Sequence, residues 1–337
     1  MLEQRFPRPT RGWTTVFFGS GAFSVPILQA LLRGPARVSA VVTRPDQPAG
    51  RGRRARPTAV KAVAVQRGIP VLEPERVNAP EAVAQVRELA PELMVLAAYG
   101  QLLGGELLSI ARIAPLNVHP SLLPKYRGAA PVAWAVLRGE RETGVTVIRM
   151  TEEVDGGCIL AQEATDIGED ETASGLEARL ALLGARLLTE TLGRLDEALA
   201  QARPQGPPPT DGSGQAPRLT KGEGQVDWRL SAEAIRRRVR GLAPWPGAYG
   251  FLRHEGRLLR LKLLRVSTSA GASGEPAGTV VQVLPDALLV QAGEGLVALR
   301  EVQPAAGRVM GVAAFQRGHQ VKHGDFFVDS AASGEPS

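Results

Sequence analysis

Apolar runs and helical patterns alternate through the first third of the chain. Runs with the length and composition of buried strands are 14–19, 37–43, 93–98 and 114–120. Segments with apolar residues at helical spacing are 24–34, 57–68 and 79–90. A strand–helix alternation of this kind predicts a parallel, doubly wound α/β sheet.

The middle of the chain adds an antiparallel pair to this sheet. Residues 144–150 and 158–167 both have strand patterns, and seven residues join them. Such a connection is too short for a helical crossover. The sheet is therefore expected to be mixed. Residues 172–201 repeat apolar residues at helical spacing and are predicted to form one long helix on its face.

Proline and glycine then interrupt every periodic pattern. Residues 202–217 contain five prolines and three glycines, a composition typical of a stiff, extended linker. Beyond them come a basic helix at 231–242 and short strands spaced as in a small β-barrel. We therefore expect an α/β domain at 1–201, a linker at 202–217 and a barrel domain at 218–337.

The charge distribution is compatible with a polyanionic partner. The net charge is +6, but residues 1–150 carry +10, residues 151–200 carry −9 and residues 201–337 carry +5. Two basic regions therefore flank an acidic one, and either could attract a polyanion. The 35 arginines against 5 lysines leave codon bias as the plainer explanation.

Composition excludes several classes of protein. A single cysteine, Cys158, allows neither an internal disulfide nor a cysteine-based metal cluster. His319 and His323 lack an evident third ligand, so no metal site is expected. The start of the chain lacks the apolar core of a signal peptide, and no apolar run approaches the ~18 residues that span a bilayer. We expect a cytoplasmic protein with no membrane contact and no obligate protein partner.

Three polar residues form the strongest chemical set. Asn117 and His119 lie two apart on a predicted strand, so both side chains point to one face, at the carboxyl end where open α/β sheets bind ligands. Asp155, in the turn before 158–167, meets them if the strand ends share a sheet edge. The plainer alternatives are a strand cap and an ordinary turn carboxylate.

An amide and an imidazolium can stabilise an oxyanion, and a carboxylate can hold the imidazole protonated and oriented. The set therefore suits the transfer of an acyl or one-carbon group to an amine.

Residues 43–58 form a long basic connection between a predicted strand and a predicted helix, where about two to six residues usually suffice. Its arginines are Arg44, Arg51, Arg53, Arg54 and Arg56. Because guanidinium forks match phosphate oxygens, a phosphate-contacting loop is favoured over a merely solvated one. The predicted helix at 231–242 is also rich in arginine and contains Arg236, Arg237, Arg238 and Arg240.

Motifs along nearly the whole chain resemble those of the folate-dependent formyltransferases. The Asn-x-His-x-Ser-Leu-Leu-Pro element at 117–124 is specific to that group. The arginine-rich loop and the motifs of the second domain narrow the likeness to the methionyl-tRNA formyltransferase family. The matching segments are 44–54, 95–103, 117–131, 142–147, 154–157, 219–228 and 244–249.

The resemblance implies roles for particular residues. In that family the Asn, His and Asp, here Asn117, His119 and Asp155, act on the formyl group of 10-formyltetrahydrofolate, the formyl donor. The loop that lies against the folate corresponds to Ser121, Leu122, Leu123 and Pro124. The reaction formylates the α-amino group of initiator methionyl-tRNA for translation initiation, and needs no metal.

The resemblance also assigns the RNA contacts. The family's second domain is an oligonucleotide-binding (OB)-like barrel that contacts tRNA. The stretch from Arg44 to Arg56 corresponds to the basic loop that enters the acceptor end of the initiator tRNA.

The chain departs from the family's pattern in two places. The first turn, 19–23, lacks the usual Gly-Thr-Pro-acid-Phe sequence, and Pro120 stands where many members have glycine. The glycines of that turn also lack the third glycine of a dinucleotide fingerprint, so a tight strand–helix turn is expected.

Two rival functions share part of this pattern. A formyltransferase acting on a small amine, such as a sugar nucleotide or glycinamide ribonucleotide, would share the triad but leaves the arginine loop and the basic second domain unexplained. A non-enzymatic RNA-binding protein on a decayed enzyme fold leaves the intact triad unexplained.

Overall fold

The computed structural model describes residues 12–34, 36–49, 54–271 and 273–328, which form two compact units. The first holds the chain up to Val132, Arg141–Ile167 and Gly175–Pro217. The second holds Ala133–Glu140, Gly168–Ser174 and the chain from Arg218 onward. Two short segments that lie before residue 201 in the sequence therefore pack with the second unit.

The first unit is built on a mixed sheet of order β10-β9-β7-β6-β1-β2-β5. The strands β7, β6, β1, β2 and β5 are parallel, whereas β9 is antiparallel to both β7 and β10. The predicted mixed, Rossmann-like sheet is thus confirmed. The bounds are β1 Trp13–Gly19, β2 Ala36–Val42, β5 Val71–Leu72, β6 Leu93–Ala97, β7 Ala114–His119, β9 Glu142–Arg149 and β10 Ile159–Asp166.

Helices cover this sheet on both faces. On one face α3 and α4 pack with Val16, Phe18 and Met94. On the other, α6 approaches the sheet closely, because a Cβ added to Gly184 would lie 2.9 Å from Val118. The helices before residue 201 are α1 Ser24–Arg33, α2 Ala59–Gln66, α3 Pro80–Glu88, α4 Gly105–Leu108, α5 Pro131–Arg138, α6 Ala173–Gly193 and α7 Leu195–Ala200, of which α5 belongs mostly to the second unit.

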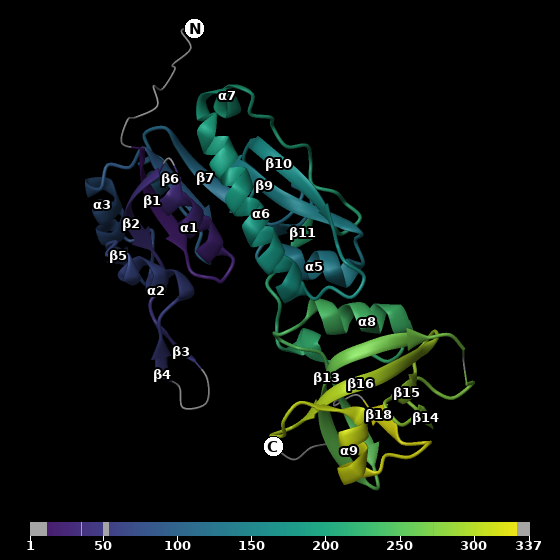
Figure 1. Ribbon diagram of the computed structural model, residues 1–337. Helices are drawn as coiled ribbons and strands as arrows, with labels where there is room; N and C mark the ends of the chain where they lie inside the picture. The colour runs from purple at the N-terminus through teal and green to yellow at the C-terminus, as the bar shows by residue number, and fades with distance from the viewer. Residues whose placement is uncertain (1–11, 35, 50–53, 272, 329–337) are drawn as a thin grey trace. The chain divides into compact units, whose positions relative to one another are not determined.

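Figure 1 shows α6 running along the sheet and α7 following it. The single helix predicted over 172–201 is wrong in this respect, because Arg194 has a non-helical backbone, with φ −132° and ψ 42°. Within the described ranges, no helix is both long enough and apolar enough to cross a membrane.

The Pro- and Gly-rich stretch 202–217, which we expected to be a linker, bonds to the first unit at both ends. Near its start, the backbones of Arg203 and Ile159 exchange two hydrogen bonds of 2.7 and 2.9 Å. Near its end, β11 (Gln215–Ala216) pairs in parallel with β8 (Arg127–Gly128). These contacts join the stretch to the start of β10 and to β8.

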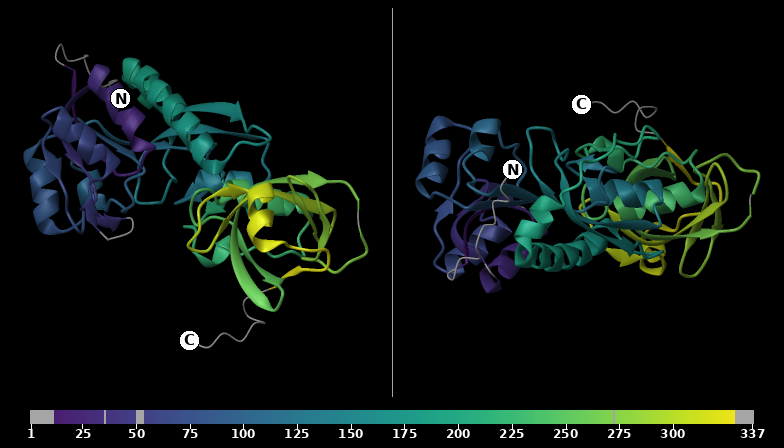
Figure 2. Two further views of the ribbon diagram at one scale, coloured as in Figure 1. Left: turned by 60° about the horizontal axis from the view of Figure 1, so that its bottom comes forward. Right: turned by 90° about the horizontal axis from the view of Figure 1, so that it is seen from above.

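The second unit is a curled antiparallel sheet of order β14-β15-β16-β13-β12-β18, to which β17 adds at β16. Its edges meet, because Val280 donates to the Asp325 carbonyl at 2.7 Å and Phe327 donates to the Gly278 carbonyl at 2.9 Å. Figure 2 shows the curl from two further directions. The small β-barrel that we expected for this region is confirmed in the form of a curled antiparallel sheet.

Helices α8 and α9 contribute Ile235, Val239 and Phe315 to the core inside this sheet. The bounds in the second unit are the short 3₁₀ helix η1 Gly222–Gly224, α8 Ala232–Gly241, β12 Tyr249–His254, β13 Arg257–Ser269, β14 Val280–Val283, β15 Leu288–Gln291, β16 Leu296–Pro304, β17 Met310–Gly311, α9 Val312–His319 and β18 Phe326–Val328.

Candidate active site

The carboxyl end of β7 carries Asn117 and His119, which are 7% and 4% exposed. Their register partners on β9 are Ile148 and Thr146. Val118, between them, points to the opposite face, toward α6. The two polar side chains therefore share the sheet face that lies away from α6.

Asp155 meets both of these residues. Its Oδ1 accepts a hydrogen bond of 3.0 Å from the Asn117 amide, and its Oδ2 lies 3.5 Å from His119 Nδ1. Oδ2 also accepts a 2.9 Å bond from the backbone N–H of Gly128. The structure thus brings the predicted Asn, His and Asp together, around a carboxylate whose side chain is 12% exposed.

The turn that carries Asp155 has an unusual backbone. Asp155 has φ +51°, in the left-handed region. A Cβ on Gly157 would lie 1.8 Å from the Arg149 carbonyl oxygen, so a side chain does not fit there. The "VDGG" sequence therefore supplies a turn that passes close to the end of β9 and aims the carboxylate at β7.

The second nitrogen of His119 fixes the ring. Nε2 lies 3.0 Å from the backbone carbonyl of Tyr126, which can only accept, so Nε2 carries a hydrogen. The Nδ1 atom faces the Asp155 carboxylate. The two contacts therefore fix the orientation of the ring, with Nδ1 toward Asp155 and Nε2 toward the backbone of Tyr126.

The side chains of the predicted folate loop alternate between buried and half-buried positions. Ser121 is fully buried, and its hydroxyl donates to the Lys125 carbonyl at 2.6 Å. Leu123 packs into a small core with Ile148 and Ile159, and its N–H bonds to the Thr146 hydroxyl. Leu122 and Pro124 are half-buried, so these two have the more accessible side chains of the loop.

The basic loop contains a hairpin. Strands β3 (Gln47–Ala49) and β4 (Arg54–Arg56) pair in antiparallel fashion and project from the first unit in Figure 1. Arg51, Arg53 and the side chain of Arg54 lie outside the described residues. Arg56 is exposed.

Arg44, before the hairpin, is half-buried, and its backbone N–H bonds to the Ser20 hydroxyl at 3.1 Å. Its guanidinium lowers the pKa of Tyr99, but burial dominates and raises that pKa to about 12.

Ion pairs fasten the base of the hairpin. Lys61 on α2 lies 2.8 Å from both Asp46 and Glu73, and these hydrogen-bonded carboxylates raise the pKa of Lys61. Since Asp46 immediately precedes β3, the pairs connect the hairpin to the sheet edge at β5.

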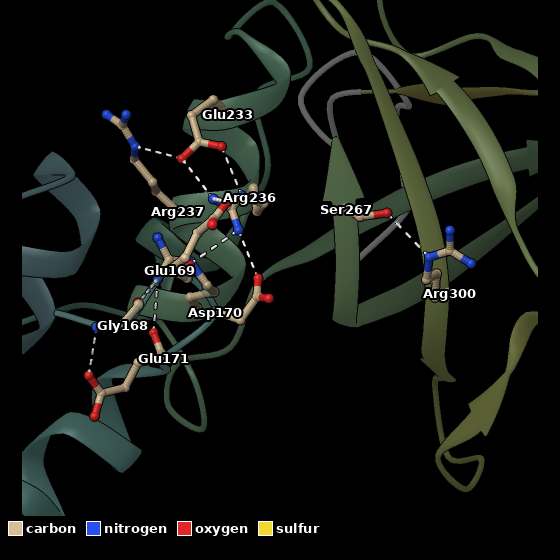
Figure 3. Close-up of polar contacts among 10 residues, drawn as sticks. Gly168, Glu169, Asp170, Glu171, Glu233, Arg236, Arg237, Ser267 and Arg300 are labelled. Atoms are coloured by element: carbon tan, nitrogen blue, oxygen red, sulfur yellow. Dashed lines mark hydrogen bonds and ion pairs between the residues drawn. The ribbon is translucent and has the colours of Figure 1, made fainter. Parts of the chain in front are cut away.

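The arginines of α8 serve the second unit itself. Arg236 donates to Glu233 and Asp170, both at 2.8 Å, and its side chain is only 11% exposed. Arg240 donates to the carbonyls of Gly168 and Glu171. Figure 3 shows these contacts, which join segment 168–171 to α8. Of the four arginines that we noted on this helix, Arg236 and Arg240 therefore hold the second unit together.

Two backbone groups contribute to the site but could not be predicted from the sequence. The Tyr126 carbonyl and the Gly128 N–H bond to the triad, and both residues have positive φ angles, +59° and +121°. They belong to the matched "KYRGAAP" motif, but a motif does not reveal which backbone groups it presents. Among the described residues, no group of three or more His, Cys, Asp or Glu side chains is placed to hold a metal ion.

Comparison with protein families matches both units. The formyl transferase model matches residues 14–192, and the formyl transferase C-terminal domain model matches residues 218–320. The site at the end of β7 lies inside the first match.

Relatives of nearly full length narrow this result. A methionyl-tRNA formyltransferase of Citrifermentans bemidjiense is 41% identical over 96% of this chain and 98% of that protein. One of Halorhodospira halophila is 44% identical over 92% of this chain and 97% of that protein. The chain therefore belongs to the formyl transferase family and, within it, to the methionyl-tRNA formyltransferases.

Solved structures share the fold at lower identity. An N-formyltransferase of Helicobacter canadensis, in complex with folinic acid and dTDP-3-aminofucose, superposes with a TM-score of 0.61 at 15% identity and covers 86% of this chain and 99% of that one. HypX of Aquifex aeolicus, in complex with tetrahydrofolic acid, gives 0.57 at 16% identity over 94% of this chain and 51% of that one.

The cluster around Arg236 predicts a pH-dependent stability. Burial raises the pKa of Glu233, but hydrogen bonds from Arg236 and Arg237 outweigh it and lower that pKa below the ordinary 4.5. A lowered folded-state pKa contributes stability above the unfolded value that is lost as the pH falls through the folded value. In Arg236→Met this contribution should shrink, so the free energy of unfolding should fall less steeply below about pH 4.5.

Chemical unfolding at several pH values measures this slope. Arg308→Met, at an exposed position of the same unit, is the matched control and should keep the wild-type slope. Parallel curves for wild type and Arg236→Met would contradict the assignment.

Proposed function

We propose that this chain transfers the formyl group of 10-formyltetrahydrofolate to the α-amino group of initiator methionyl-tRNA, with Asn117, His119 and Asp155 as its catalytic residues. The observation that carries the proposal is the Asp155 carboxylate bonded to Asn117 and facing His119 at the end of β7. Because the acceptor is an aminoacylated tRNA, the proposed place of action is the cytoplasm.

The reaction moves one acyl group and one proton. The neutral α-amino group, which is accessible near neutrality because its pKa is about 7.7–8.0, attacks the formyl carbon. A new C–N bond forms, and the carbonyl oxygen becomes an oxyanion. The bond to the folate nitrogen then breaks, and the proton lost by the amine ends on that nitrogen.

Asn117 is proposed to stabilise the oxyanion. A side-chain amide has two N–H donors, and one of them is held by Asp155 Oδ1. That bond fixes the plane of the amide and leaves its second N–H for the formyl oxygen. A donor fixed before the reaction stabilises developing charge without having to reorganise.

His119 is proposed to add a positive charge beside the same oxygen. Its Nε2–H is taken up by the Tyr126 carbonyl, so Nδ1 is the ring nitrogen left to act. At 3.5 Å from Asp155 Oδ2, Nδ1 lies beyond an ordinary hydrogen bond and its proton can serve a closer acceptor. Asp155 orients both donors and relays the proton from the amine.

The folate is proposed to lie against the loop of Ser121, Leu122, Leu123 and Pro124. Leu122 and Pro124 supply apolar contact, since they are the half-buried members. The side chains of Ser121 and Leu123 are buried inside the loop, so their role is to keep the loop in the shape that binds the folate. A preformed apolar wall next to fixed polar groups is typical of small-molecule sites.

RNA contacts are proposed for the hairpin and for one face of the second unit. On that face Tyr249 and Phe251 of β12 lie opposite Lys262 and Arg260 of β13. The guanidinium of Arg260 sits 4.1 Å above the Tyr249 ring, and Trp245 nearby in sequence is 52% exposed. Aromatic rings among cations suit stacked bases and phosphates, which supports a tRNA-binding role for residues 218–337.

A comparison of four acceptor substrates tests the function. The protein is incubated with 10-formyltetrahydrofolate and, in separate reactions, labelled initiator methionyl-tRNA, elongator methionyl-tRNA, glycinamide ribonucleotide and an amino-sugar nucleotide. The proposal predicts formylmethionine on the initiator tRNA far faster than any other product. Formylation of the small amines alone would overturn the tRNA assignment, and binding of tRNA without any transfer would favour the non-enzymatic rival.

Asn117→Ala should lower the turnover number far more than it raises the KM for the folate, because its amide acts on the oxyanion. Loss of one such donor costs about 10²–10³ in rate. Steady-state kinetics with both substrates varied gives the answer. A variant with near-normal turnover would remove Asn117 from the mechanism.

The proposed role of the hairpin predicts how tRNA affinity depends on salt concentration. Replacing Arg51, Arg53 and Arg54 with alanine should weaken tRNA binding, and each lost phosphate contact should reduce the log–log salt slope by about 0.7–0.9. Folate affinity should stay unchanged, because the hairpin follows β2 whereas the folate loop, residues 121–124, follows β7. Equal affinities and parallel salt lines for the two proteins would leave RNA recognition to the second unit alone.

A further inference from the structure

Gln205, in the middle of the Pro- and Gly-rich stretch, bonds directly to the turn that carries Asp155. Its Nε2 donates to the Asp155 carbonyl at 2.6 Å and to the Gly157 carbonyl at 2.8 Å. The two amide hydrogens of Gln205 thus bond to the carbonyls of the residues directly before and after Gly156. The amide spans the turn from outside, while the Asp155 carboxylate lies on Asn117 and Gly128.

The orientation of this amide is determined by its other neighbour. Its Oε1 accepts from Arg127 Nε at 3.1 Å and Nη2 at 2.8 Å. Because a guanidinium only donates and a carbonyl only accepts, the oxygen of Gln205 must face Arg127 and its nitrogen must face the turn. The Arg127 side chain, 11% exposed, also donates to Glu153, at the start of the same turn.

These contacts matter because the turn is held in an uncommon conformation. A residue other than glycine with φ +51° is disfavoured in isolation, and neighbouring contacts must select it. Gln205 holds the backbone carbonyl of that same residue. Arg127 lies directly between Tyr126 and Gly128, whose backbone groups contact His119 and Asp155. One amide therefore links both loops on which the triad depends.

We propose that Gln205 is a positioning residue for catalysis, which keeps the Asp155 turn in its left-handed conformation so that the carboxylate meets Asn117 and His119. The inference rests on the proposed formyl transfer, and it gives the Pro- and Gly-rich stretch a role in the active site. Pro204, directly before Gln205, fixes its own φ angle and so limits how the chain enters this contact.

Two substitutions of Gln205 test whether it positions the catalytic residues. Gln205→Glu keeps an oxygen for Arg127 but sets a carboxylate oxygen against the carbonyls of Asp155 and Gly157. Gln205→Ala removes both contacts. Both variants should lose about 10- to 100-fold in kcat, with little change in KM for either substrate, because a small misplacement of a catalytic group costs that much. Gln201→Ala, at an exposed position near the start of the stretch, should match the wild type.

A double-mutant cycle completes the test. In an Asp155→Asn background, Gln205→Glu should cause little further loss, because residues that act through one another are not additive. Wild-type kcat in Gln205→Glu, or losses that multiply in the double variant, would overturn the proposal. All variants are compared with the wild type on whichever amine the wild type formylates, so a failure of the tRNA assignment is recognised separately.

Discussion

The site depends on one largely buried carboxylate, which accepts hydrogen bonds from two donors and faces the ring of a third residue. Asp155 accepts from the Asn117 amide and the Gly128 N–H, and it faces the His119 ring. A buried charge is tolerated only where such partners compensate its lost hydration. Two of these partners, Asn117 and His119, are the donors that the proposed mechanism uses. The interaction that makes Asp155 acceptable inside the fold therefore also orients the amide and the imidazole.

Much of this could be predicted from the sequence, because the signals were local. Period-two placement on a strand put Asn117 and His119 on one face, and a seven-residue connection made β9 and β10 antiparallel. The glycines after Asp155 marked its turn. That the turn reaches β7 depended on the order of strands, which places β9 beside β7.

The features that the sequence did not reveal arise from contacts between distant segments. Gln205 lies 50 positions from Asp155 in a stretch whose composition predicts only irregular structure. Nothing in local spacing indicates that its amide spans a turn. The break at Arg194 was likewise hidden, because apolar residues keep helical spacing on both sides of it.

Charge was the least informative pattern by itself. The arginines of α8 resembled an RNA-binding stripe, yet Arg236 and Arg240 bond to segment 168–171 inside the second unit. Arg260, which had no special pattern, lies over an aromatic ring on the sheet surface. A basic residue counts toward a polyanion site only after its internal partners are known, since a buried, paired guanidinium is not free for phosphate.

The most direct test of the central claim is the single-turnover rate of formyl transfer in Asp155→Asn, measured together with the Kd for the folate. Asparagine tolerates the left-handed backbone, so the turn should persist. One of the two carboxylate oxygens, however, is replaced by an amide nitrogen. This nitrogen cannot accept the hydrogen bond that the oxygen accepted. We expect a rate lower by about 10²–10³, with folate affinity largely kept. A near-normal rate would contradict it, because Asp155 would then be dispensable to the chemistry.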